Sequence, residues 1–257
     1  MSTTATMSPT ASIAVLHTSL LFVSPDSVIN EYLSELAPDA KVLHFVDSDV
    51  LAAVVRDGEV SPASTQRMVH LAQAAQAAGA DVIFSACSSV GPAIDVARRL
   101  VSVPIVKIDD AMAASAVETA DAIGVLATVP TTLPPTRALV EEKARAVGRD
   151  ITVQELLCEG AFSVLMSGDR DGHDAIVLGG ARALAKEVDV IVLAQASMAP
   201  LAPAITEAVG KPVLSSPRSG TENAVRVLHE QTAEPAHAAA SAWETTQTQW
   251  QGGCGAR

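Results

Sequence analysis

The sequence predicts an α/β fold of two pseudo-symmetric domains, each a four-stranded parallel sheet flanked by helices. Three observations support this prediction. Short apolar runs alternate with helical patterns, and the first half of the chain is echoed in the second. Hydrophobic residues make up 49% of the chain but aromatic residues only 3%, so the core consists of Ala, Val, Leu and Ile. Such a core is typical of parallel sheets that are covered on both faces.

In the first half, apolar runs predict strands at 12–17, 41–46, 81–86 and 103–108. The first helix is expected to start at Ser24, which would act as its N-cap, with Pro25 in the first helical position. The remaining helices of this half are expected at 49–56, at 62–79, from Pro92 onward and at 110–121.

The second half repeats this order of elements. Strands are expected at 122–127, 151–157, 189–194 and 211–215, and helices at 133–147, 160–166, 172–187, 200–209 and 219–230. Ligands of such sheets bind beyond the carboxyl ends of the strands. This rule selects five loops as the predicted site: 17–19, 87–89, 128–132, 195–198 and 215–218.

An internal repeat supports the division into two domains. DVIFSACSSVGP at 81–92 matches DVIVLAQASMAP at 189–200 without a gap, and IAVLHT at 13–18 resembles IGVLAT at 123–128. A period this long indicates duplicated domains rather than a solenoid. We therefore expect a first domain at 12–120 and a second at 121–233. Within the repeat, Cys87 is matched by Gln195.

The ends of the chain and its composition narrow the class of protein. Residues 1–11 are expected to be a disordered leader, and 234–257 a tail in which a helix is left open. An odd count of three cysteines without CxxC spacing points to the reducing cytoplasm. The net charge is −12 without a basic patch, so nucleic acid is not an expected partner. No apolar run approaches the roughly 20 residues of a membrane span, and a homo-oligomer is left open.

Cys87 is the first candidate for chemistry. It is expected between the end of a strand and the start of a helix, where free amides and the helix dipole lower the pKa of a thiol. A small buried hydrophobic residue is the competing interpretation. His17, at the end of the first strand, is a second candidate acid/base, and a solvated or capping histidine is the competing interpretation. Gln195 cannot release a proton near pH 7, but its amide can hydrogen-bond a carboxylate or an enolate. A packed polar residue at a strand end is the competing interpretation.

Hydroxyl groups and backbone amides of the five loops are the candidate substrate-binding groups. Helix capping is the competing role for at least half of them. The candidates are Thr18, Ser19, Ser88, Ser89, Thr128, Thr131, Thr132, Ala196, Ser197 and Ser216.

Several other polar residues receive weaker predictions. Cys158 follows a peripheral strand, so structural burial is expected. Asp109 and Asp110 follow the fourth strand with Lys107 and could contact the site, although helix N-capping explains the two acids well. Arg218 either binds a carboxylate in a bidentate manner or lies at the surface. No metal-binding spacing of histidines and no nucleotide-binding glycine motif is present, so no metal or cofactor is expected.

Three segments resemble the aspartate/glutamate racemase superfamily, which includes hydantoin racemases, maleate isomerases and arylmalonate decarboxylases. FSACSS at 84–89 is similar to its first cysteine motif, and LAQASM at 193–198 stands in the place of the second. IGVLAT at 123–128, together with Thr132, is similar to the strand and threonine loop that begin its second domain. The resemblance implies two facing domains with the active site in the cleft between them, and catalysis without a cofactor.

In this family one thiolate removes a proton next to a carboxylate and a second thiol protonates the opposite face. This chain departs from that pattern because Gln195 stands in the place of the second cysteine. The first hypothesis is a racemase or isomerase that uses Cys87 on a small carboxylic acid. The alternatives are a single-cysteine lyase, such as a malonate-type decarboxylase, and a non-catalytic protein that binds small acids.

Overall fold

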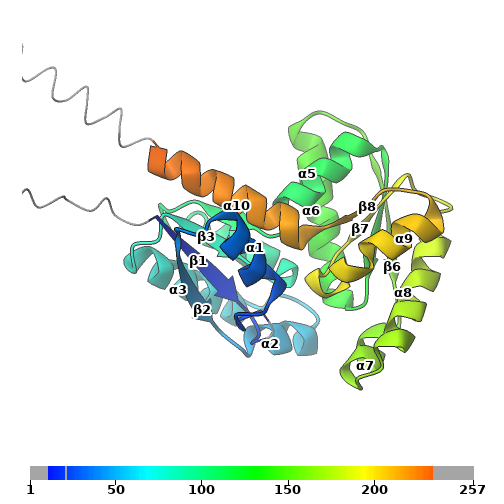
Figure 1. Cartoon of the computed structure of the whole chain (residues 1–257), viewed down its shortest axis with the longest axis horizontal. Helices are drawn as coiled ribbons and strands as arrows, with labels where there is room; N and C mark the ends of the chain where they lie inside the picture. Colours follow the sequence, from blue (N-terminus) through cyan, green and yellow to red (C-terminus); the bar gives the residue numbers. More distant parts are fainter. Residues whose placement is uncertain (1–10, 21, 234–257) are drawn as a thin grey trace, which may run out of the picture.

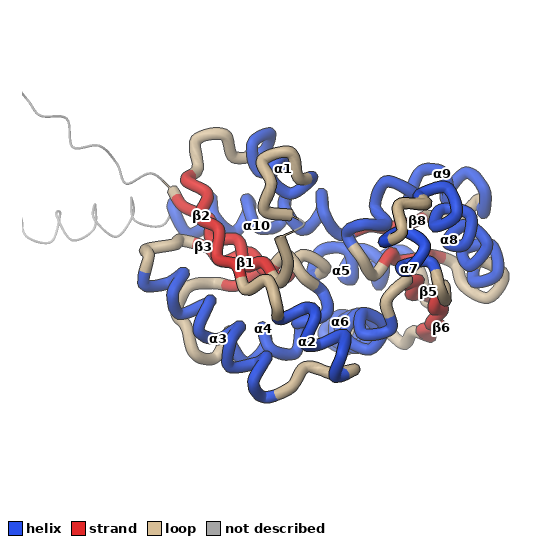
Figure 2. Tube along the Cα trace, turned by 90° about the horizontal axis from the view of Figure 1, so that it is seen from below, coloured by secondary structure: helices blue, strands red, loops and turns tan. Residues whose placement is uncertain are grey.

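The computed structural model describes residues 11–20 and 22–233 of the chain. Apart from Ala11, the predicted leader lies outside the described residues, as does the tail at 234–257 with Cys254. The described residues form two four-stranded parallel sheets, which confirms the predicted fold class. Figure 2 shows the strands gathered into two groups, each surrounded by helices.

The strands of the two sheets follow the same order in space. The first sheet has the order β2-β1-β3-β4, and the second has β6-β5-β7-β8. The strands are β1 (Ser12–His17), β2 (Lys41–Val46), β3 (Val82–Ser85), β4 (Ile105–Lys107), β5 (Ala122–Ala127), β6 (Thr152–Leu157), β7 (Val190–Leu193) and β8 (Val213–Ser215). Each pair of adjacent strands is parallel, so all carboxyl ends of a sheet meet at one edge.

Helices cover both faces of each sheet. They are α1 (Val28–Leu36), α2 (Val50–Asp57), α3 (Pro62–Ala77), α4 (Gly91–Ala97), α5 (Asp110–Thr119), α6 (Leu133–Ala146), α7 (Ala161–Met166), α8 (Arg170–Leu184), α9 (Ala202–Val209) and α10 (Ser216–Ala233). Three short 3₁₀ turns, η1 (Ser88–Val90), η2 (Pro130–Thr132) and η3 (Ala196–Leu201), directly follow strand ends. No helix among the described residues has both the length and the apolar character needed to cross a membrane.

The last helix of each half packs on the sheet of the other half. Met112 and Val117 of α5 belong to the core that contains strands β5 and β7. Ala224 and Leu228 of α10 belong to the core that contains strands β1 and β3, and Figure 1 shows α10 lying beside α1 over this first sheet. The sequence repeat therefore divides the chain near residue 120, but the cores do not follow this division. Helix α5 of the first half belongs to the core of the second, and α10 of the second half belongs to the core of the first.

A glycine permits this exchange. Gly220 lies in α10 where the helix crosses the end of β4, and a Cβ atom at this position would stand 2.2 Å from the carbonyl oxygen of Ile108. Because backbone cannot move aside as a flexible side chain can, only glycine allows the two segments to approach so closely. At this point α10 of the second half lies directly against the residue that follows β4 of the first half.

The start of the first helix differs from the prediction. Helix α1 begins at Val28, and its N-cap is Ser27, whose side chain accepts a hydrogen bond from the backbone N–H of Asn30. Ser24 instead uses its carbonyl oxygen, which accepts a hydrogen bond of 2.8 Å from the Asn30 side chain. A Ser-Pro pair is a common helix start, but here a second serine three residues later caps the helix.

Candidate active site

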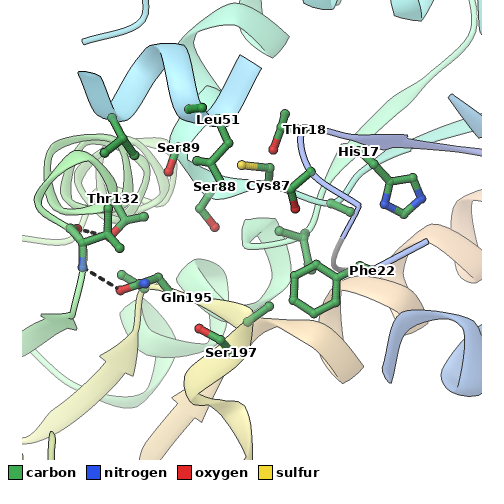
Figure 3. A pocket seen from close by; sticks show the side chains of 18 of the residues that line it. His17, Thr18, Phe22, Leu51, Cys87, Ser88, Ser89, Thr132, Gln195 and Ser197 are labelled. Atoms are coloured by element: carbon green, nitrogen blue, oxygen red, sulfur yellow. Dashed lines mark hydrogen bonds between the residues drawn. The ribbon is translucent and has the colours of Figure 1, made fainter. Parts of the chain in front are cut away.

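A cavity of about 370 Å³ lies at the carboxyl ends of the strands and is lined by both halves of the chain. Cys87 and Thr18 lie on one side of it, and Gln195 and Ser197 lie on the other (Figure 3). Its lining residues are His17, Thr18, Ser19, Phe22, Ser48, Leu51, Ala52, Val55, Ala86, Cys87, Ser88, Ser89, Ile108, Val129, Thr132, Phe162, Ala194, Gln195, Ala196 and Ser197.

The cysteine of the first half is placed by a strand-to-helix turn. Cys87 follows β3 in an extended conformation and precedes η1 and α4, and its side chain is partly accessible from the cavity. Apolar residues of the first core pack against the rest of the side chain. The predicted position between a strand end and a helix start is confirmed.

The prediction that the pKa of this thiol is lowered is wrong. Burial raises the pKa of Cys87 above its ordinary value, although the Thr18 hydroxyl and the backbone amides of Ser89 and Val90 act to lower it. The nearby carboxyl of Asp109 raises the pKa further. The loss of hydration outweighs the helix amides because the cavity is small and mostly apolar. Cys87 is therefore a neutral thiol at pH 7.

Gln195 stands at the position of the second half that corresponds to Cys87, and its side chain is hydrogen-bonded to the loop after β5. Its Oε1 atom accepts hydrogen bonds from the backbone N–H groups of Thr128 at 2.6 Å and Val129 at 3.1 Å. Its Nε2 atom lies 3.0 Å from the Thr128 hydroxyl. Two backbone donors face the same atom, so that atom must be the amide oxygen. The amide thus ties the end of β7 to the loop that follows β5.

His17 lines the cavity, but its ring is hydrogen-bonded to another histidine. Its Nε2 atom is 3.0 Å from Nδ1 of His44 on the neighbouring strand β2. Burial, helped by His44, lowers the pKa of His17 to about 4. His17 is therefore neutral at pH 7, and its repeat counterpart is Ala127, which has no polar side chain.

The structure brings most of the predicted binding residues together. Thr18, Ser19, Ser88, Ser89, Thr132, Ala196 and Ser197 all line the cavity. Three others do not line it. Thr128 contacts Gln195 instead, Thr131 is buried, and Ser216 is fully buried at the start of α10.

The residues with weaker predictions lie around the cavity rather than on it. Cys158 is buried in the core of the second half, and burial raises its pKa to about 11. Arg218 lies at the surface, where it pairs with Glu35 at 2.7 Å and stacks over Tyr32. Lys107 forms an ion pair of 3.0 Å with Asp95. Asp109 is buried, and burial raises the pKa of its carboxyl.

Sequence reasoning missed the apolar part of the cavity wall. Leu51, Ala52 and Val55 of α2 face the cavity together with Phe22 and Phe162. The three α2 residues share one helix face, and Val55 and Phe162 are exposed although they are large and apolar. That helical spacing was visible in the sequence, but it did not reveal which face of α2 meets the cavity.

No charged side chain lines this cavity among the described residues. The same part of the chain holds no cluster of three or more His, Cys, Asp or Glu residues arranged to bind a metal ion. The polar groups of the wall are hydroxyls, backbone amides, the Cys87 thiol, the Gln195 amide and the neutral His17 ring. This set can hold one anionic group by hydrogen bonds beside an apolar substituent.

Comparison with known proteins gives a consistent result. Residues 27–224 match the family model described as Asp/Glu/Hydantoin racemase. Solved structures with the same fold include a glutamate racemase from Bacillus anthracis, at 16% identity and a TM-score of 0.68 over 86% of this chain and 82% of that one. Allantoin racemase from Klebsiella pneumoniae is 20% identical, with a TM-score of 0.58 over 87% of this chain and 88% of that one.

A lyase has the same fold. A glycine-to-cysteine mutant of arylmalonate decarboxylase is 15% identical, with a TM-score of 0.54 over 84% of this chain and 93% of that one. A search of curated proteins gives no match. The family model covers most of the sequence, including both strand-end corners. The chain therefore belongs to the Asp/Glu/Hydantoin racemase family.

Proposed function

We propose that the protein is a cofactor-independent isomerase of the racemase type. In this proposal the Cys87 thiol exchanges a proton with the carbon next to the carboxylate or carbonyl of a small acid. The observation that carries the proposal is that Cys87 is the one thiol lining the cavity among the described residues. Membership of the racemase family supports the reaction class.

The chemistry needs a base that removes the proton and donors that hold the resulting enolate. Cys87 must first lose its own proton to water. The Thr18 hydroxyl and the backbone amides of Ser89 and Val90 lower the pKa of the thiol and so oppose the larger effect of burial. The hydroxyls of Thr18, Ser88 and Ser89 lie on the same wall and are the proposed donors to the enolate oxygens. Gln195 has no proton to exchange near pH 7, so it takes no part in proton transfer in this proposal.

A site with one acid/base works on one face of the substrate. The proton that Cys87 removes is returned by Cys87 to the same face unless the planar carbanion turns or water protonates the other face. Exchange of the α-hydrogen with solvent is therefore expected to be faster than inversion of configuration. A two-thiol racemase differs because its second thiol protonates the opposite face directly.

The cavity wall also suggests what the acid carries. The ammonium group of an α-amino acid finds no carboxylate there, because the lining contains no Asp or Glu among the described residues. Leu51, Val55 and Phe22 instead offer an apolar surface. Burial of an apolar substituent contributes roughly 25 cal/mol per Å². The proposed substrate is a small acid with an uncharged apolar substituent.

One observation favours a lyase as the second candidate. Burial raises the pKa of Cys87, so the thiol is protonated and ready to act as a proton donor. In a malonate-type decarboxylation the bond between the central carbon and one carboxylate breaks and CO₂ leaves. The electron pair left on carbon takes the thiol proton, and the thiolate then recovers a proton from water. Only one donor is needed.

Proton exchange in D₂O tests the isomerase proposal. The purified protein is incubated with phenyl- and alkyl-substituted α-chiral acids, and loss of the α-hydrogen signal is followed by NMR. Exchange by the wild type that disappears in Cys87→Ser supports the proposal. No exchange with any acid, combined with CO₂ release from substituted malonates, would replace it by the lyase.

A further inference from the structure

The loop after β5 presents two successive backbone N–H groups to a single acceptor. The N–H groups of Thr128 and Val129 both donate to Oε1 of Gln195, at 2.6 and 3.1 Å. Successive N–H groups that converge in this way form a concavity suited to an anion. A carboxylate oxygen at the same point would accept the same bonds more strongly, because the acceptor would be charged.

The first half contains the corresponding loop without the internal acceptor. Thr18 and Ser19 stand 110 positions before Thr128 and Val129 in the repeat, and both line the cavity. Among the described residues, no acceptor is found for their backbone N–H groups. The residue that faces this loop is Cys87 rather than a glutamine, and its shorter side chain leaves the space beside it open.

We infer that the Gln195 carboxamide fills an anion-binding site of the second half from within the protein and so restricts the cavity to acids with one anionic group. The inference rests on the proposed function only in treating the cavity as a site for acids. The open loop at Thr18 and Ser19 receives the carboxylate. A second anionic group of a substrate meets a filled site on the opposite wall.

The uncharged lining makes this restriction effective. A second carboxylate that cannot reach the Thr128 and Val129 amides finds no Lys or Arg on the wall among the described residues. It would then lose its hydration without a strong partner, which is unfavourable in a small apolar cavity. Gln195 is therefore a specificity-determining residue that discriminates against dicarboxylic acids.

Binding of two acids of equal chain length tests the inference. Succinate carries two carboxylates and butyrate carries one, and calorimetry gives the Kd of each for the wild type and for Gln195→Ala. We expect Gln195→Ala to bind succinate at least about tenfold more tightly than the wild type does, because the two freed N–H groups donate hydrogen bonds to the second carboxylate. Its affinity for butyrate is expected to change by less than about threefold.

Thermal stability provides a second measurement on the same variants. Gln195→Ala leaves the two amides without an acceptor, so acetate is expected to raise its Tm more than that of the wild type. Gln195→Glu is the matched control, because its carboxylate refills the site and acetate is expected to raise its Tm no more than that of the wild type. If Gln195→Ala is poorly folded, Gln195→Asn, one methylene shorter, replaces it.

A folded Gln195→Ala protein that binds succinate no more tightly than the wild type, and gains no stability from acetate, overturns the inference. Neither measurement depends on turnover. If acetate and succinate behave as expected while no acid exchanges its α-hydrogen, then the filled site stands and the isomerase proposal fails.

Discussion

The two strand-end corners of this protein have similar backbone conformations and different chemistry. In the first half, Cys87 leaves a thiol and an open loop at Thr18 on the cavity wall. In the second half, Gln195 occupies the same place in the repeat and bonds to the loop at Thr128. The second half thus has no thiol at this corner, and the Gln195 side chain fills the site beside the loop. A duplicated fold can therefore keep its symmetry while only one wall of its cavity carries an acid/base group.

Removal of the remaining thiol is expected to have the largest effect. Cys87→Ser keeps the size of the side chain but replaces the thiol by a hydroxyl of much higher pKa. We expect α-hydrogen exchange to fall by about 10²- to 10⁴-fold, the usual contribution of a general acid/base. Rates are measured by NMR in D₂O. Cys158→Ala is the control, since Cys158 is buried away from the cavity, and an equal loss in that variant would argue against a special role for Cys87.

Restoring a thiol to the second corner is expected to have the next largest effect. Gln195→Cys places a second acid/base on the wall opposite Cys87, so inversion of configuration should accelerate by about 10- to 100-fold. Chiral chromatography of the acid measures inversion directly. Gln195→Ala also empties the corner but adds no thiol, so an equal acceleration in that variant would mean that space, not acid/base chemistry, limits inversion.

The reactivity of Cys87 toward an alkylating reagent tests its environment. Because burial raises the pKa of this thiol, alkylation by iodoacetamide at pH 7 is expected to be about tenfold or more slower than that of free cysteine. The rate should continue to rise at pH values where free cysteine has reached its plateau. Mass spectrometry identifies the modified residue, and a plateau below the ordinary cysteine pKa would contradict the account of a neutral thiol.

The smallest expected effect concerns His17, which has no polar counterpart in the second half. Its pKa falls from 6.5 to about 4 on folding, so the unfolded chain binds more protons between these two pH values. Stability is therefore lost as the pH falls from 6.5 toward 4. His17→Gln should reduce this loss by about 1–2 kcal/mol, a figure lowered to allow for solvent screening. Urea unfolding at pH 7 and pH 5 measures it, and an unchanged pH dependence would exclude His17 as the source.

Much of the fold could be predicted from the sequence, because the internal repeat can be read directly from the order of the residues. The alternation of strands and helices, the two sheets, and the placement of Cys87 and Gln195 at equivalent corners follow from local pattern. The rotamer of Gln195 does not, because it depends on two amides that lie 66 and 67 residues away.

Other features depend on packing between distant segments. The pairing of His17 with His44, the apolar wall from α2 and the exchange of α5 and α10 all arise from contacts across the fold. The raised pKa of Cys87 also depends on packing between distant segments. A strand end before a helix predicts a lowered value, but the degree of burial that reverses it is set by the assembled cavity.

The ratio of hydrogen exchange to inversion tests the one-sided cavity most directly. A single enantiomer of a phenyl-substituted acid is incubated with the wild type in D₂O, and α-deuterium and enantiomeric composition are followed together. Deuterium is expected to enter faster than configuration is lost, so the acid recovered early carries α-deuterium and keeps its original configuration. Equal rates of labelling and inversion, as in a site with two acid/base groups, would contradict this expectation.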